Sequence, residues 1–254
     1  MQQLTLSLEQ EITSHLLVRW DLPNWAKYFT YNLNNLQPSS NVLIGSTGPT
    51  FELDYRDNPF HTTKGTFTKL NLEYGAPGIL QSSPQVNFYR TVGSFSHTLS
   101  VYKGIVWANQ FRGGYVKNIE DPAQGGYVPW TQKGFLLGGP TTIRGFTVAE
   151  AFPNTKDFGG NLNYQLLNEA SMYLVKSELR IPIKGNIGIL FFFDGGAVVI
   201  PEYNYGFGFR DSAGIGLLYD TPVGPAIFDI GWKLNEVGSR GEAPLSLDVS
   251  IGTF

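Results

Sequence analysis

The 254-residue chain contains no cysteine. This absence excludes a disulfide framework, a thiolate metal site and a catalytic thiol. No run of 18 apolar residues occurs, so we expect no transmembrane helix. Charged residues make up 15% of the chain, against about 25% in soluble proteins. The net charge of -3 provides no basic surface for nucleic acid.

Glycine and aromatic residues are abundant instead: the chain has 30 Gly, 18 Phe and 13 Tyr. Low charge combined with many aromatic residues is typical of a transmembrane β-barrel, which has an apolar outside and a polar inside. A soluble β-sandwich or β-solenoid is the alternative. The N-terminal residues alternate like a strand and have neither the basic nor the apolar region of a signal peptide. A transmembrane β-barrel must be exported, so we expect either that an export signal was removed or that the chain is cut from a longer protein.

Alternation with period 2 predicts an all-β fold of about twelve antiparallel strands. In the last strand, Leu245, Leu247, Val249 and Ile251 lie on the face opposite to the polar residues, as expected for lipid-facing and lumen-facing sides. An even number of strands could close into a barrel by itself. The predicted strands cover residues 3–12, 15–22, 26–34, 42–57, 66–75, 86–99, 104–116, 170–183, 187–199, 211–220, 226–234 and 245–253.

One long connection, residues 117–169, separates two of these strands. Connections of this length inside a domain are usually functional. It contains Arg144, flanked by apolar residues and glycines, and a buried arginine requires an acidic partner. Glu178 and Asp194 each stand in the middle of a predicted strand downstream. We therefore expect an extracellular loop that folds into the lumen, with Glu178 and Asp194 as the candidate partners of Arg144.

Five stretches of the sequence, in order, carry a resemblance to a known family. They are 51–60 with 63–65 (a DNP turn and glycine), 138–146 (GGPTTIRGF), 192–196 (FFDGG), 212–217 with 221–225 (SAGIGL and TPVGP), and a last strand that ends in Phe254. Together they resemble the C-terminal β-barrel of the BamA/TamA/FhaC superfamily of outer-membrane insertases and two-partner-secretion translocases. The likeness covers residues 51–254 by motif and residues 1–50 by strand pattern alone.

The resemblance implies an integral protein of the bacterial outer membrane with one barrel domain, residues 1–254. It implies a loop latch between Arg144, Glu178 and Asp194. Its implied partners are the lipid bilayer, unfolded outer-membrane or secreted proteins, and a POTRA-bearing segment or accessory lipoproteins, with no cofactor and no nucleic acid. The loop motif comprises Gly138, Gly139, Ile143, Gly145 and Phe146, and the C-terminal strand signal comprises Leu247, Val249, Ile251 and Phe254.

Two features depart from the family pattern. Family members have POTRA domains ahead of a sixteen-stranded barrel, whereas the sequence shows no POTRA pattern and twelve predicted strands. Phe254 is also one residue out of phase with Leu247, Val249 and Ile251. A natural small barrel and a part of a longer insertase both remain open, as does a second chain that supplies strands.

The implied function is insertion or translocation of proteins through a lateral strand seam, and the alternative is a passive channel or a membrane anchor for a passenger domain.

No enzyme is expected, because Ser212 and Ser246 lack a paired histidine and aspartate. No metal site is expected either, because His15, His61 and His97 are dispersed. Asp229 and Lys233 are interpreted as general lumen polarity.

Overall fold

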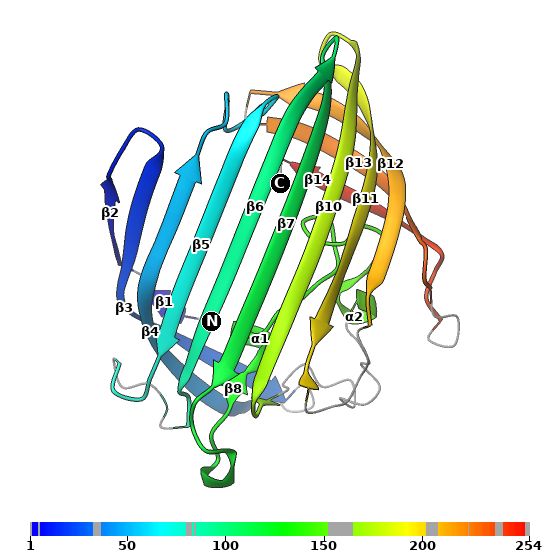
Figure 1. Ribbon diagram of the computed structural model, residues 1–254. Coiled ribbons are helices and arrows are strands. Elements are labelled where there is room, and N and C mark those ends of the chain that lie inside the picture. Colours follow the sequence, from blue (N-terminus) through cyan, green and yellow to red (C-terminus); the bar gives the residue numbers. More distant parts are fainter. Residues whose placement is uncertain are drawn as a thin grey trace.

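The computed structural model describes residues 2–4, 6–32, 37–79, 83, 85–151, 165–201, 208–222, 224–236 and 241–251. Nearly all of these residues belong to one antiparallel β-sheet that curls around a central lumen (Figure 1). The strands of this sheet are β1 (Gln2–Leu4), β2 (Ser7–Glu11), β3 (Leu16–Asn32), β4 (Gln37–Asp54), β5 (Gly65–Gly75), β6 (Phe88–Tyr102), β7 (Ile105–Asn118), β10 (Glu169–Lys184), β11 (Ile187–Val199), β12 (Arg210–Thr221), β13 (Gly224–Lys233) and β14 (Leu245–Ile251).

The twelve strands of the sheet make eleven spans, because β1 and β2 lie end to end beside β3. The predicted strands 15–22 and 26–34 are one strand, β3, which continues through a register irregularity between Asp21 and Asn24. The sequence pattern breaks at this irregularity and therefore resembles a turn. Within the described ranges, β14 pairs with β13 alone, and β1 and β2 pair with β3 alone. The sequence left open whether about twelve strands close by themselves, and among the described residues the two edges of the sheet do not pair with each other.

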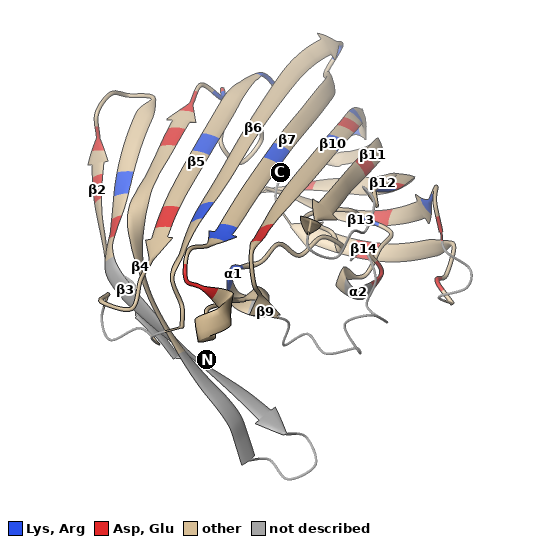
Figure 2. Cartoon of the chain, turned by 60° about the horizontal axis from the view of Figure 1, so that its bottom comes forward, with Lys and Arg blue, Asp and Glu red and all other residues tan. Residues whose placement is uncertain are grey.

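The strands alternate between an apolar outer face and an inner face that carries the polar groups. In β10, Tyr173 and Leu179 are 49% and 37% exposed on the outside, whereas Lys176 and Glu178 are buried inside. Most of each strand is free of charged residues (Figure 2). This arrangement places apolar side chains toward lipid and polar side chains toward the lumen.

The two ends of the sheet differ in the length of their connections. Two-residue turns join β6 to β7, β10 to β11 and β12 to β13, whereas 50 residues separate β7 from β10. Short turns mark the periplasmic end of outer-membrane barrels and long loops the extracellular end. No helix in the described part of the chain is long and apolar enough to cross a bilayer.

The long connection contains five short elements. They are a 3-10 turn (Pro122–Gln124), β8 (Val128–Pro129), α1 (Trp130–Lys133), α2 (Val148–Ala151) and β9 (Gln165–Leu166). The part of this connection from α1 to α2 lies inside the curl of the sheet, whereas the 3-10 turn projects beyond its rim (Figure 1).

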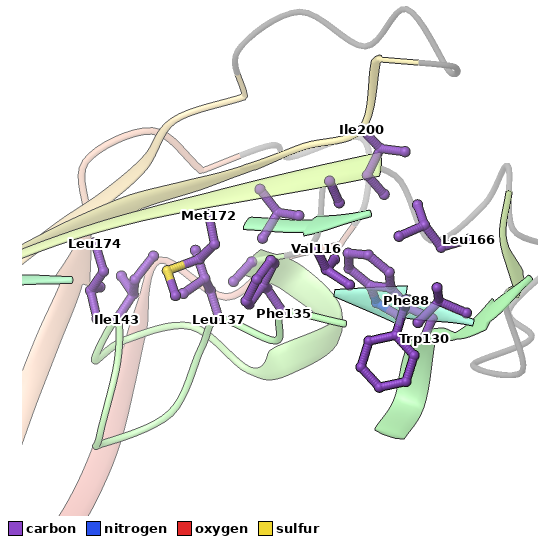
Figure 3. Packing of buried hydrophobic residues seen from close by; sticks show 14 of the residues in the cluster. Phe88, Val116, Trp130, Phe135, Leu137, Ile143, Leu166, Met172, Leu174 and Ile200 are labelled. Carbon is purple, nitrogen blue, oxygen red and sulfur yellow. The ribbon is translucent and has the colours of Figure 1, made fainter. Parts of the chain in front are cut away.

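Apolar side chains of this connection pack against the lumen wall. Phe135, Leu137 and Ile143 from the loop contact a cluster that includes Met172 and Leu174 of β10 (Figure 3). All five side chains are almost fully buried. Burial of apolar area is the main favourable contribution to such packing, at about 25 cal/mol per Å². The extracellular half of the lumen therefore contains an apolar core, where composition alone suggested a polar interior.

Candidate functional site

The tip of the inward-folded loop is a tight hairpin between Gly138 and Phe146. The backbone N–H of Gly139 donates to the carbonyl of Phe146 at 2.7 Å, and the Thr142 N–H donates to the Gly139 carbonyl at 3.1 Å. Gly138 and Gly145 have φ angles of 105° and 89°. These left-handed conformations favour glycine because it has no Cβ. The hairpin presents Arg144 to the wall.

Arg144 forms a two-pronged ion pair with Asp194 of β11. Its Nε lies 2.6 Å from Asp194 Oδ2, and its Nη2 lies 2.8 Å from Oδ1. The backbone N–H of Arg144 also donates to Oδ2 at 3.1 Å. Arg144 is 1% exposed and Asp194 is fully buried. A planar guanidinium matches a carboxylate in this geometry, whereas a lysine ammonium acts as a point charge.

Two further carboxylates complete the surroundings of the guanidinium. Arg144 Nη1 lies 2.7 Å from Glu178 Oε1 on β10 and 3.3 Å from Asp229 Oδ2 on β13. The other carboxylate oxygen of Glu178 accepts hydrogen bonds from Arg180 at 2.6 and 2.9 Å. One loop residue thus connects three strands of the wall.

The charges in this cluster balance. Three cations, Arg144, Lys176 and Arg180, face the three carboxylates. Lys176 Nζ lies 4.0 Å from Asp194 Oδ2 and donates to the Pro140 carbonyl at 3.3 Å. Burial lowers the pKa of Arg144, but its hydrogen bonds to Asp194 and the charges of Glu178, Asp194 and Asp229 outweigh burial and raise that pKa. The guanidinium is therefore charged at every physiological pH.

One aromatic ring and two glycines of the wall allow the loop to approach closely. The guanidinium carbon of Arg144 lies 3.7 Å from the centre of the Phe192 ring, a cation–π arrangement. Gly214 makes room for that ring, because a Cβ there would come within 2.4 Å of it. Gly231 lets the loop backbone approach, because a Cβ there would lie 3.0 Å from Gly145.

Backbone groups of the loop are also held by wall side chains. The Ser212 hydroxyl on β12 donates to the Arg144 carbonyl at 2.6 Å, and the Gly145 N–H donates to Asp248 on β14 at 2.9 Å. With Glu178, Asp194 and Asp229, these contacts join the loop tip to every strand from β10 to β14.

Phe146 lies between two cations at the extracellular side of the cluster. The guanidinium carbon of Arg210 is 4.8 Å and Lys233 Nζ is 5.2 Å from its ring centre. Lys233 also binds Glu150 of α2 at 2.8 Å. Glu150 in turn accepts from the Thr147 N–H at 2.8 Å, and this reciprocal Thr147–Glu150 pair is a capping box.

The structure brings Arg144, Glu178 and Asp194 together, and places Gly138, Gly139, Ile143, Gly145 and Phe146 in the same inward-folded hairpin. Leu247, Val249 and Ile251 lie exposed on the outer side of β14. Phe254 lies outside the described residues.

Sequence reasoning missed the specific role of Asp229 and Lys233, which it treated as general polarity. It also missed Ser212 and Asp248 as ligands of the loop backbone. Strand alternation already placed Asp229, Lys233 and Asp248 on the inner face. No pattern in the chain could show that these residues meet a loop about 70 to 100 positions away.

The described residues offer no group of three or more His, Asp or Glu side chains placed to hold a metal ion. The guanidinium of Arg144 is held by ion pairs to Asp194, Glu178 and Asp229, whereas Asp229 Oδ1 has no hydrogen-bond partner among the described residues.

Fold and site together define a transmembrane β-barrel fold with a loop held inside its lumen. Comparison with known families identifies the kind: residues 18–254 match the Omp85 superfamily domain, and the chain belongs to that superfamily. Among solved structures, it is similar to BamA from Haemophilus ducreyi lacking POTRA domains 1-3, with a TM-score of 0.65 and 14% identity. That match covers 96% of this chain and 51% of the BamA chain, so this chain spans about half the length of its structural relative. The search of curated proteins gave no significant match.

Proposed function

We propose that this barrel inserts proteins into the outer membrane or translocates them across it, through a seam at its last strand. The observation that carries the proposal is the loop held by Arg144 inside a barrel of the Omp85 superfamily. The partners that follow are the outer-membrane bilayer, unfolded client proteins, and a POTRA-bearing segment or accessory lipoproteins.

The edge of β14 supports the seam. Seven residue pairs join β14 to β13, against ten between β12 and β13, and the other side of β14 has no strand partner among the described residues. Unpaired backbone N–H and C=O groups at a sheet edge attract an additional strand. An incoming client strand would pair with this edge and then leave as its own sheet grows.

The loop has a separate role in this mechanism. Its tip holds β10 to β14 in one arrangement through Arg144 and Gly145. Because Asp248 of β14 binds the Gly145 N–H, movement of the last strand is coupled to the loop. The loop thus keeps the lumen closed while the edge exchanges partners.

A reconstitution experiment tests the proposal. The full chain is placed in liposomes, and folding of a urea-denatured β-barrel client is followed by its resistance to heat denaturation in gels. We expect faster client folding than in empty liposomes and loss of that gain in Arg144→Ala. Lys69→Ala, which removes a lumen ion pair with Glu52 at 2.6 Å far from the loop, is the matched control.

Site-specific crosslinking tests the edge directly, because the chain has no native cysteine. Val249→Cys on β14 should crosslink to a client cysteine, whereas Phe191→Cys in the middle of the sheet should not; both side chains are exposed. Equal crosslinking at both positions, with no gain in client folding, would instead favour a passive channel or membrane anchor.

A further inference from the structure

The connection between β4 and β5, residues 55–64, contains the Asp-Asn-Pro motif of the sequence. We call this connection the strap. It lies at the end of the sheet where the short turns join the strands, which is drawn at the top in Figure 1. The contacts of the lumen loop around Arg144 do not involve the strap, so its motif requires a separate explanation.

Two side chains of the motif fix the shape of the strap. Asp57 Oδ1 accepts the backbone N–H groups of Asn58, Thr63 and Lys64 at 3.0 to 3.2 Å, and these bonds close the base of the strap. Asn58 Oδ1 accepts the backbone N–H of His61 at 3.1 Å. Asp and Asn side chains that bind nearby backbone amides in this way order a turn. The motif therefore holds His61 in a defined position.

His61 reaches the far side of the barrel. Its Nε2 lies 2.7 Å from the carbonyl oxygen of Thr221, at the end of β12, and therefore donates a hydrogen bond to it. Asp220 Oδ1 of the same strand lies 3.6 Å from His61 Nδ1. The Ser100 hydroxyl of β6 donates to the Thr63 carbonyl at 3.1 Å. The strap is thus attached to two strands that are not its neighbours in the chain.

The strap lies over the ends of the strands between these two attachments. A cavity of about 140 Å³ separates it from the wall. The strap contributes His61 and Thr62 to the lining of this cavity, and the wall contributes Val106 of β7, Arg180 of β10 and Leu218 of β12. The strap therefore crosses the short-turn mouth of the lumen beside these strands.

The contact between His61 and Thr221 depends on the curl of the sheet. Strand register aligns Gly65, the first residue of β5, with Gly214 of β12. Five strand spacings, about 24 Å, separate the two strands, and Thr221 lies about 23 Å further along β12. On a flat sheet, Gly65 and Thr221 would be about 33 Å apart. The four residues from Gly65 to His61 span at most about 14 Å. One side chain and one hydrogen bond cannot cover the remainder, so the contact exists only while the sheet is curled.

We propose that the strap is a clasp that fixes the curl of the sheet at its short-turn end. It joins the β4–β5 side of the barrel to β12 across the lumen, and the hydrogen bond from His61 completes the connection. β13 and β14 lie beyond the point of attachment, so these two strands can move while β4 to β12 keep one curvature. The clasp acts on the barrel itself, and it holds whether or not the barrel inserts client proteins.

Pulsed electron paramagnetic resonance on the full chain in detergent tests the clasp. Because the chain has no cysteine, spin labels attach only at Leu70→Cys on β5 and Tyr219→Cys on β12, and both positions are exposed. The protein with native His61 should give one narrow distribution of label-to-label distances. His61→Ala should shift this distribution to longer distances and broaden it, because the sheet loses its connection across the lumen.

Two further variants separate the clasp from a local contact. His61→Gln should keep the narrow distribution, because the glutamine amide can donate to the same Thr221 carbonyl. His15→Ala is the matched control: His15 Nδ1 contacts the Asp54 carbonyl at 2.8 Å at the same end of the sheet, but this contact does not cross the lumen. An unchanged distribution in His61→Ala, or equal broadening in His15→Ala, would overturn the proposal.

Histidine tautomers test the contact in the wild type. At about pH 8, where histidine is ordinarily neutral, His61 should carry a proton on Nε2 to donate to Thr221, whereas His15 should carry one on Nδ1 to donate to Asp54. Nitrogen NMR of histidine-labelled protein distinguishes the two forms, and His61→Gln assigns the His61 signal. A His61 ring without a proton on Nε2 would overturn the proposal.

Discussion

The inward-folded loop contacts the wall through two different kinds of interaction. At the extracellular half of the lumen, Phe135, Leu137 and Ile143 form an apolar cluster with the wall. At the tip, Arg144 meets Asp194 in a buried, charge-balanced network. Apolar burial is non-directional and tolerates changes of shape, whereas a two-pronged ion pair requires one geometry. The apolar half, around Leu137, packs the loop against the wall, and the ionic half, around Arg144, fixes the position of the loop.

The stability of the docked loop and the specificity of its position have different sources. Replacing a whole buried ion-pair network by apolar residues is often neutral, whereas removing one partner costs much. Arg144 is therefore better explained as a device that fixes one loop position than as the main source of stability. The apolar cluster should contribute most of the net free energy of loop docking.

The largest loss of unfolding free energy should come from Arg144→Ala. It leaves Asp194, Glu178 and Asp229 buried without the guanidinium, and removal of one partner of a buried pair costs about 3–5 kcal/mol. Arg144→Lys should recover little, because lysine cannot pair with Asp194 in two-pronged geometry. Urea unfolding of the barrel in detergent measures the stability of both variants. Wild-type stability in Arg144→Lys would contradict the requirement for two-pronged geometry.

The apolar half should respond to volume rather than to geometry. Leu137→Ala should destabilise the loop by about 2–5 kcal/mol, and Leu137→Met by less than about 1.5 kcal/mol. The same urea-unfolding assay compares these two variants with Arg144→Ala and Arg144→Lys. A methionine substitution as damaging as alanine would show that this half is as specific as the ionic half.

A smaller effect is expected from Gly231→Ala. Its Cβ would lie 3.0 Å from Gly145, so the loop must shift at a cost of about 1–3 kcal/mol. Gly113→Ala on β7 is the control, since its Cβ would be 3.9 Å from the nearest atom. Protease sensitivity of the loop should rise in the first variant alone; equal sensitivity in both would contradict close backbone contact.

The smallest effect concerns Glu150 and pH. Burial raises its pKa, but hydrogen bonds from Lys233 and Thr147 outweigh burial and hold the pKa below the ordinary 4.5 of glutamate. A carboxylate with a lowered folded-state pKa stabilises above its unfolded pKa and loses that contribution as pH falls through the folded value. Amide exchange at residues 147–151 should therefore increase below about pH 4.5, relative to a peptide reference. Glu150→Gln should abolish this pH dependence, and its persistence in the variant would assign it to another group.

Much of this architecture could be predicted locally. Period-2 alternation located the spans and their faces, and the cost of burying Arg144 unpaired indicated carboxylates on the wall. The continuity of β3 through its register irregularity could not be predicted, because the irregularity interrupts alternation as a turn does. The choice of Asp229 and Asp248 as partners depends on how the sheet curls, which no short window of sequence records.

The apolar filling of the extracellular half was also beyond a local pattern. Leu137 and Phe135 stand in a glycine-rich stretch without periodicity, and only the tertiary contact with Met172 and Leu174 gives them a role. Composition suggested a polar lumen because most inward positions are polar, and it could not show which part of the lumen the loop fills.

Single-channel conductance of the wild type and of Arg144→Ala in planar bilayers tests the central claim most directly. The account predicts a small, flickering conductance in the wild type, because the loop fills the lumen, and a large, unstable conductance in the variant. A large and steady conductance in both proteins would contradict it, because the loop would then neither close the lumen nor depend on Arg144 for its position.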